Sequence, residues 1–238
     1  MKKPQLKPWL KSLAFQLGYK EPNYGSCFGF HNEKYEELYK WLKRALKLQG
    51  GILEFGIATG GSTCLMAEYI KSHHSSKRLD SFDSFTGFDP QEFDENFSQG
   101  YVTDLTVKNS WQTPEFRFSY VQRKLKAYKF SQFVSLHRGF FQDTLPQFLA
   151  DSDETYSFAL IDCDLASSIE FCANSIYPHM SPGGIILFDD YASLEPNKPD
   201  TAYSPGVKMA VDQFIEQHTP SAHGYDNGLY HFVKTETS

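Results

Sequence analysis

Two short apolar segments of the sequence each end in a pair of acidic residues. Asp162 and Asp164 follow the first segment, and Asp189 and Asp190 follow the second. If both segments are parallel strands, their carboxyl ends align along one edge of a sheet, which is the usual place for a ligand in open α/β sheets. Carboxylates gathered there repel one another and raise each other's pKa values unless a cation neutralises them. A hard divalent cation with oxygen ligands, Mg²⁺ above all, is therefore predicted.

A metal ion bound at this edge would activate a hydroxyl group of a substrate. The ion would act as a Lewis acid that lowers the pKa of a substrate hydroxyl, and Asp164, two residues after Asp162, could accept the proton as general base. Rival bases are His31, His137 and His223, although a lone histidine is more often structural. The alternative interpretation is that each acidic pair caps a neighbouring helix or faces solvent.

A glycine-rich stretch earlier in the chain predicts a ligand-binding turn. Residues 51–63 begin as an apolar run that ends in an acid, continue with glycines and then open a helical pattern, so they indicate strand, tight turn and helix. The spacing is E-x-G-x-x-x-G-G rather than the G-x-G-x-x-G that suits a pyrophosphate. An acid before the turn favours a positively charged ligand such as S-adenosylmethionine; the alternative is a glycine-rich turn without a ligand. The expected contact residues are Glu54, Gly56, Gly60, Gly61 and Ser62.

Further positions are predicted to complete a nucleoside-binding pocket. Asp83 ends the second predicted strand, 22 residues beyond Gly61, where nucleotide-binding folds place a carboxylate that receives both ribose hydroxyls. Its alternative role is to cap the end of the strand. Gly139 and Phe140 follow the third predicted strand, at a position where an adenine ring could lie.

The alternation of apolar and amphipathic segments predicts an α/β fold. Continuous apolar runs separated by helical patterns are typical of a mostly parallel sheet covered by helices on both faces. The predicted strands are residues 51–55, 78–85, 133–137, 157–164 and 185–188, with an antiparallel edge strand at 229–234. The helices predicted between them are 62–72, 124–130, 167–177 and 206–215, and one more that Pro146 begins after a cap at Thr144. A turn is predicted at 181–184.

The chain is expected to form one domain with an N-terminal extension. Residues 1–50 carry two helical patterns, at 7–18 and 33–48, and are predicted to form a helical extension and cap. Residues 51–238 are predicted to form the α/β domain. Within it, residues 87–128 lose the strand–helix pattern and are long for a connection, which favours a lid-like insertion.

Composition and charge limit the classes of partner. The chain has 238 residues and a net charge of −6, which disfavours nucleic acid because phosphate binding needs a basic face. No apolar segment reaches the length of a membrane span, and the N-terminal sequence lacks the apolar run of a signal peptide. The four cysteines show no metal-binding spacing. We expect a cytoplasmic protein that acts on a small molecule, with no nucleic-acid or membrane partner; a homo-oligomer is left open.

Together these motifs resemble the macrocin O-methyltransferase family of class I S-adenosylmethionine-dependent enzymes. The resemblance runs from about residue 51 to residue 215. It rests on Glu54-x-Gly56…Gly60-Gly61-Ser62, Asp83-Ser84-Phe85-x-Gly87, Gly139-x-Phe141-x-Asp143-Thr144-Leu145-Pro146, Asp162-x-Asp164-x-x-x-Ser168, Tyr177-Pro178-x-x-Ser181-Pro182-Gly183-Gly184 and Asp189-Asp190-Tyr191.

The resemblance implies a Rossmann-like fold and an Mg²⁺-assisted enzyme. That family methylates sugar hydroxyls on macrolide and aminocoumarin-type natural products. By resemblance, Asp162, Asp189 and Asp190 would bind the metal and Asp164 would be the candidate base. Ser84 and Asp162 are also predicted to lie beside the cofactor.

The chain departs from the family after the fourth predicted strand. Cys163 and Ala166 stand where the family usually has glycine and tyrosine, and Leu165-Ala166-Ser167-Ser168 replaces Leu-Tyr-Glu-Ser. These departures concern the substrate rather than the cofactor. Three other functions are kept as alternatives: nitrogen methylation without a metal, a nicotinamide-dependent oxidoreductase, which the glycine spacing disfavours, and a non-catalytic binding domain that retains the fold.

Overall fold

The computed structural model describes most of the chain. The described residues are 10, 11, 14, 15, 17, 21, 24, 32–113, 117–151, 153–192 and 201–236. His31, most of the predicted loop at 19–30 and much of the helix predicted at 7–18 lie outside them. In that helix, residues 10, 11, 14 and 15 are helical. The N-terminal cap therefore stays a prediction.

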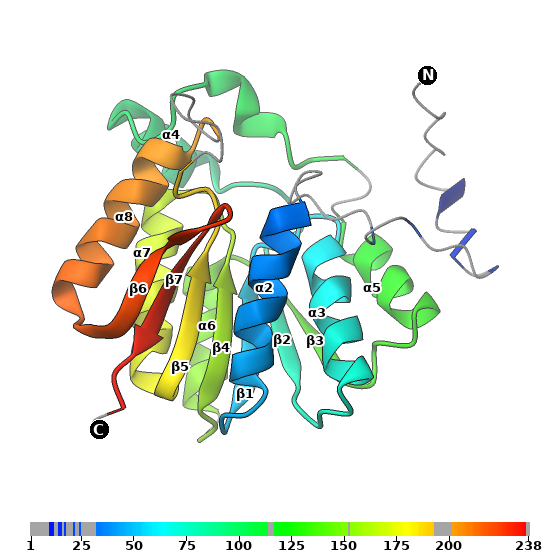
Figure 1. The fold of residues 1–238 in the computed structure, drawn as a ribbon. Coiled ribbons are helices and arrows are strands. Elements are labelled where there is room, and N and C mark those ends of the chain that lie inside the picture. Colours follow the sequence, from blue (N-terminus) through cyan, green and yellow to red (C-terminus); the bar gives the residue numbers. More distant parts are fainter. Residues whose placement is uncertain are drawn as a thin grey trace.

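A seven-stranded sheet forms the centre of the molecule (Figure 1). Its strands are β1 (Gly51–Phe55), β2 (Leu79–Asp83), β3 (Val134–Arg138), β4 (Tyr156–Ile161), β5 (Met180–Phe188), β6 (Pro220–Asp226) and β7 (Leu229–Lys234). They lie in the order β3-β2-β1-β4-β5-β7-β6. Strands β1 to β5 are parallel, and β7 is antiparallel to both of its neighbours. The mostly parallel sheet with an antiparallel edge is thus confirmed, and its order reverses between β1 and β4, where such sheets bind ligands.

The antiparallel edge is a hairpin rather than a single strand. The segment predicted as the edge strand is β7, which is buried because β6 pairs with its outer side. Strand β6 escaped prediction because its sequence is polar, short of apolar residues and largely exposed. Asn227 and Gly228, with φ of 51° and 89°, connect the two strands, and an Asn-Gly pair is the signal that could have indicated the hairpin.

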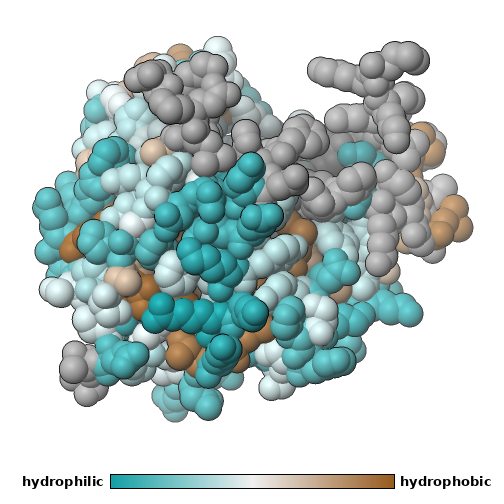
Figure 2. Space-filling model, viewed as in Figure 1, coloured by the Kyte–Doolittle hydropathy of each residue, from teal (hydrophilic) through white to brown (hydrophobic). Residues whose placement is uncertain are grey.

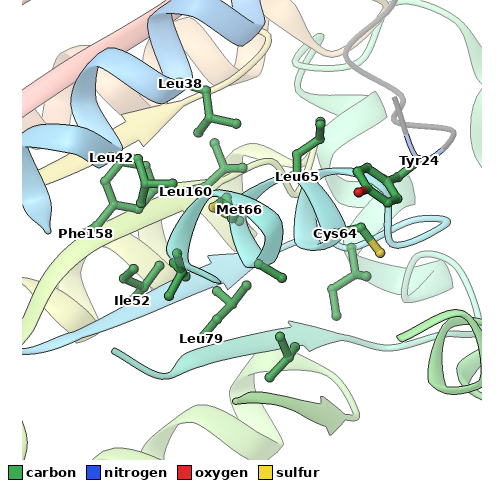
Figure 3. Close-up of a cluster of buried hydrophobic side chains, with 14 of the residues drawn as sticks. Tyr24, Leu38, Leu42, Ile52, Cys64, Leu65, Met66, Leu79, Phe158 and Leu160 are labelled. Carbon is green, nitrogen blue, oxygen red and sulfur yellow. The ribbon is translucent and has the colours of Figure 1, made fainter. Parts of the chain in front are cut away.

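Helices cover both faces of the sheet. They are α2 (Asn32–Ala45), α3 (Gly61–Ser72), α4 (Pro90–Ser98), α5 (Phe118–Ala127), α6 (Phe141–Ala150), α7 (Ala166–Ile176) and α8 (Ser204–Gln217), with short 3-10 turns η2 (Leu105–Asn109) and η4 (Tyr177–His179). Successive strand residues point to opposite faces, so Ile52 packs with α2, α3 and α5, whereas Leu53 packs with α6, α7 and α8. Figure 3 shows Leu42, Ile52 and Met66 of the first cluster, contributed by α2, β1 and α3.

The segment at 87–128 contains more regular structure than its sequence predicts. Asp89 caps α4 by accepting hydrogen bonds from the backbone N–H groups of Gln91 (2.9 Å) and Glu92 (3.0 Å), a common way to satisfy a helix N-terminus. Helix α5 begins at Phe118, earlier than the short helix predicted at 124–130. In Figure 1, α4 lies at the end of the sheet toward which the parallel strands point.

The helix expected to start at Pro146 begins earlier. Pro146 lies inside α6, whose first residue is Phe141. The Thr144 hydroxyl donates to the backbone carbonyl of Phe140 at 3.1 Å, so Thr144 does not act as an N-cap. Pro146 is the sixth residue of α6, so the helix tolerates a proline in its interior at the cost of one backbone hydrogen bond, and the prediction that the proline marks the helix start was wrong.

The turn expected at 181–184 is part of β5. Tyr156 of β4 pairs with Met180, yet Phe158, two residues later, already pairs with Ile185. The glycines of this segment therefore form an irregular bulge within the strand rather than a turn before it.

The face of the molecule that Figure 2 shows is mainly polar. Figure 2 shows one face of the molecule, on which hydrophilic side chains predominate and apolar ones form small separate areas. In the part of the chain that the structure describes, no helix has both the length and the apolar composition needed to cross a membrane.

Candidate active site

The glycine-rich turn connects β1 to α3 and requires glycine at its first position. Gly56 has a φ of 84°, and a Cβ atom added there would lie 1.8 Å from the carbonyl oxygen of Asp162. That oxygen directly follows β4, so the missing side chain lets the ends of β1 and β4 approach each other. Gly60, at φ 75°, is also confined, because a Cβ atom added there would lie 2.8 Å from the side chain of Val121 in α5. The predicted tight turn is confirmed.

Asp83, at the end of β2, holds this turn through backbone hydrogen bonds. Its Oδ2 accepts from the N–H groups of Ile57 (2.8 Å) and Ala58 (3.2 Å), and its Oδ1 accepts from the N–H of Phe85 (2.6 Å). Burial raises the pKa of Asp83, and these N–H groups oppose the rise. A carboxylate offers about four acceptor positions, so Asp83, which lines the cavity, keeps capacity for a ligand hydroxyl.

Glu54 lies beneath the turn. Its side chain is fully buried and accepts hydrogen bonds from the hydroxyls of Ser62 (2.5 Å), Thr63 (2.7 Å) and Ser81 (2.7 Å). Desolvation raises the pKa of Glu54 to about 7, although the three hydroxyls oppose that rise. The carboxylate therefore fixes the start of α3 against β1 and β2.

A cavity of about 290 Å³ lies above the turn. Of the residues predicted to bind the cofactor, those that line it are Gly56, Asp83, Ser84, Phe140 and Asp162. The predicted residues that do not line it are Glu54, Gly60, Gly61, Ser62 and Gly139. The structure thus brings the ends of β1, β2 and β4 to one cavity, as the sequence predicts, and half of the candidates line it.

Three carboxylates meet in this cavity. Asp162 and Asp164 after β4 and Asp190 after β5 each offer an oxygen within 4.8 Å of the other two. Asp164 (φ 65°) and Asp190 (φ 58°) have a left-handed backbone, a strained conformation that concentrates at functional sites. Burial and neighbouring carboxylates raise the pKa values of Asp162 and Asp190 well above the usual range. Burial also raises the pKa of Asp164 to about 7.

Asp189, expected in the same cluster, is paired with a lysine of α2. Lys34 Nζ donates to Asp189 Oδ1 at 2.7 Å, and only 7% and 5% of the two side chains are exposed. The N–H of Asp190 donates to the same oxygen at 2.9 Å. Our sequence analysis missed Lys34, which lines the cavity. Its position four residues before Leu38, on the apolar side of α2, was the available signal.

The insertion and the start of α8 form another wall of the cavity. Its aromatic side chains are Phe88, Trp111 and Tyr203. Glu92 Oε1 of α4 accepts hydrogen bonds from the hydroxyls of Ser167 (2.7 Å) and Ser168 (2.5 Å). The segment 165–168 is therefore bound to the insertion.

The two described histidines considered as rival bases lie elsewhere. His137 Nε2 shares a hydrogen bond with Asp80 (2.8 Å), and its ring stacks on Phe82 with centroids 4.3 Å apart. His223 Nδ1 shares one with the hydroxyl of Tyr230 at 2.7 Å. Neither histidine lines the cavity, so the geometry favours Asp164 as a proton acceptor over both.

Known proteins are similar to this chain in sequence. Residues 33–219 match the family model of macrocin O-methyltransferase (TylF). Demethyldecarbamoylnovobiocin O-methyltransferase of Streptomyces niveus is 28% identical over 63% of this chain and 55% of that protein. Mycinamicin III 3''-O-methyltransferase of Micromonospora griseorubida is 25% identical over 71% of this chain and 61% of that protein. The chain spans little more than half the length of the curated relatives that it matches.

Solved structures share the fold. The O-methyltransferase NovP superposes with a TM-score of 0.69 at 19% identity, over 96% of this chain and 100% of that chain. An O-methyltransferase from Bacillus cereus in complex with SAH has a TM-score of 0.59 at 14% identity, over 98% of this chain and 94% of that chain. The fold is therefore that of class I methyltransferases. Because the family model matches most of the sequence, the chain belongs to the macrocin O-methyltransferase family.

Proposed function

We propose that the protein is an S-adenosylmethionine-dependent O-methyltransferase that acts on a hydroxyl of a small molecule, a sugar or a secondary metabolite. The observation that carries the proposal is one cavity that connects the glycine-rich turn and Asp83 to Asp162, Asp164 and Asp190. The turn would hold the methyl donor with its reactive group beside these carboxylates. The names of the curated relatives, all O-methyltransferases and one acting on a rhamnosyl-tetracenomycin, support a hydroxyl acceptor.

The ends of β1, β2 and β3 would bind the nucleoside part of the methyl donor. Asp83 would accept hydrogen bonds from the ribose hydroxyls with the acceptor positions that the turn leaves open. Phe140, the residue before α6, would contact the adenine ring from the cavity wall. Glu54 would support binding indirectly, because its hydrogen bonds hold the turn in a shape that admits the ligand.

The carboxylate cluster fits a divalent cation through its donor set, which consists of oxygen atoms alone. Asp162 and Asp190 belong both to the observed cluster and to the ligand set implied by resemblance, and they would hold the ion. Asp189, which the resemblance also implies, is not part of the observed cluster, and one of its oxygens is bound by Lys34. When bound, Mg²⁺ would lower the pKa of an acceptor hydroxyl as a Lewis acid.

Asp164 would take up the proton of the acceptor. The hydroxyl oxygen forms a bond to the methyl carbon, the carbon–sulfur bond breaks with its electron pair passing to sulfur, and the proton passes to the Asp164 carboxylate. Because the methyl group is already activated by the positive sulfur, the protein mainly aligns the two reactants and excludes water. Trp111 and Tyr203, which line the same cavity, would provide that exclusion.

The alternatives make different demands on the same cavity. A nitrogen methyltransferase would use the turn and Asp83 but would need no metal. A nicotinamide-dependent oxidoreductase would need a pyrophosphate-binding turn, for which the glycine spacing is unsuited. A non-catalytic domain would tolerate replacement of the carboxylates without any change in its role.

Isothermal titration with S-adenosylmethionine and transfer of its labelled methyl group test the proposal. We expect binding of the donor, and transfer to hydroxylated or glycosylated acceptors that is lost after treatment with a chelator and restored by Mg²⁺. Asp190→Asn should abolish transfer and leave donor affinity within a few-fold of wild type, whereas the exposed Asp153→Asn should change neither. Absence of donor binding would refute the proposal. Transfer that survives both the chelator and Asp190→Asn would remove the metal, and a labelled methyl group found on nitrogen would favour nitrogen methylation.

A further inference from the structure

A second group of metal-binding side chains lies outside the candidate active site. Glu37 of α2 and Asp226 and His231 of the β6–β7 hairpin each offer one ligand atom within 4.8 Å of the other two. None of them lines the cavity. The group joins elements that are far apart in the sequence, and it contains both nitrogen and oxygen donors.

His231 supplies a buried nitrogen that the described residues do not satisfy. The residue is 8% exposed, and its Nδ1 makes no hydrogen bond within the described part of the chain. Asp226 Oδ2 is 3.5 Å from that nitrogen, which is longer than a normal hydrogen bond. A buried polar atom left without a partner destabilises a fold, so the position calls for a ligand.

The surroundings fix the position of the imidazole ring. Trp41 stacks on His231 with ring centroids 4.4 Å apart, and Gly224 faces it across the hairpin, where a Cβ atom would lie 3.2 Å from Cε1. The ring is therefore held in one orientation, as a ligand position requires.

Glu37 is held in place by neighbouring donors. Its Oε1 accepts hydrogen bonds from Trp41 Nε1 (2.6 Å) and Lys40 Nζ (2.7 Å), and its Oε2 accepts one from Asn227 Nδ2 (3.2 Å). These contacts leave acceptor capacity on Oε2. The Asp226 side chain is 51% exposed, so it can move to close the remaining distance. Partners that orient a ligating carboxylate in this way are usual around metal ions in proteins.

We propose that Glu37, Asp226 and His231 bind a divalent transition-metal ion of the Zn²⁺ type, separate from the carboxylate cluster of the cavity. One imidazole and two carboxylates suit Zn²⁺, with water as a further ligand, whereas Mg²⁺ prefers oxygen donors alone. The ion would connect α2 to the β6–β7 hairpin. Because α2 also carries Lys34, the ion would stabilise the element that supplies the partner of Asp189. This inference does not depend on the proposed methyl transfer.

Titration of the tag-free protein with Zn²⁺ in excess Mg²⁺ tests the site, since Mg²⁺ competes for the oxygen-only cluster. We expect wild-type protein and Asp190→Asn to bind Zn²⁺ with the same affinity. Asp226→Asn and His231→Gln should weaken binding at least ~10-fold, because each removes a ligand or its charge. Zn²⁺ should also raise the Tm of wild-type protein but not that of the Asp226 variant. The exposed position of Asp226 keeps the test informative if His231→Gln fails to fold.

Three results would overturn the proposal. The first is the absence of Zn²⁺ binding to wild-type protein under these conditions. The second is binding that Asp226→Asn leaves unchanged but Asp190→Asn removes, which would assign the ion to the cavity. The third is equal binding by all variants, which would show adventitious surface contacts.

Discussion

Replacing Glu54 by glutamine should change how the stability of the protein depends on pH. Glu54 is buried beneath the glycine-rich turn and accepts three side-chain hydrogen bonds. Glutamine has nearly the same shape but no titratable group. The hydroxyls of Ser62, Thr63 and Ser81 can each donate or accept, so they can still pair with the amide.

The size of the effect follows from the pKa. Desolvation raises the pKa of Glu54 from 4.5 to about 7 in the folded state. The folded state therefore binds the proton more tightly than the unfolded state, and stability falls as pH rises through this window. The stabilisation from the bound proton is fully present below pH 4.5 and is lost by about pH 7. At about 1.4 kcal/mol per pKa unit, the loss is about 3 kcal/mol.

Urea unfolding of wild type and Glu54→Gln at several pH values measures this difference. The free energy of unfolding of the variant, minus that of wild type, should increase by about 3 kcal/mol from acidic to mildly alkaline pH. The contributions of other titrating groups cancel in this difference, because both proteins carry the same groups. Glu36→Gln, at an exposed position of α2, should show no such trend. A difference that stays constant with pH would mean that Glu54 is not desolvated as described.

Further substitutions test the turn and the buried ion pair. Gly56→Ala should lower the free energy of unfolding in urea by about 3 kcal/mol, because its Cβ would meet a backbone carbonyl. The control is Gly100→Ala, where φ is also positive, at 75°, but the added Cβ would meet no other atom within 4 Å. That substitution should lower the free energy of unfolding by about 1 kcal/mol. Equal losses would argue against the close approach. Lys34→Met should destabilise by about 3 kcal/mol by leaving Asp189 buried without its cation, and the exposed Lys208→Met should cost about 1 kcal/mol or less. Similar losses of stability in Lys34→Met and Lys208→Met would show that Lys34 is not a buried partner of Asp189.

Local sequence patterns were sufficient to predict the architecture. The parallel strands are continuous apolar runs, and each is followed by an amphipathic segment, so short-range periodicity marks both element types. The outer strand β6 lacks that signal because it is polar and exposed on both sides. The bulge in β5 was not predicted either, because its glycines have the same local sequence pattern as a turn.

The acidic residues at the strand ends were predicted from the sequence because topology alone gathers them. Parallel strands place their carboxyl ends on one edge, and this brings Asp162, Asp164 and Asp190 together without further information. Which of the candidates face the cavity was not predictable. The Glu54 side chain instead accepts hydrogen bonds from hydroxyls of α3 and β2. This orientation is established only when α3 packs on the sheet.

The sequence by itself determined the strand–turn–helix order, the glycine-rich turn after the first strand and the edge at which carboxylates collect. Only the tertiary structure decided that Lys34 neutralises Asp189, 155 residues away, and that Glu37 meets His231 of the hairpin. The physical reason is that periodicity and turn chemistry act between near neighbours in the chain. Charge pairing and desolvation depend instead on distances that exist only after distant elements have packed.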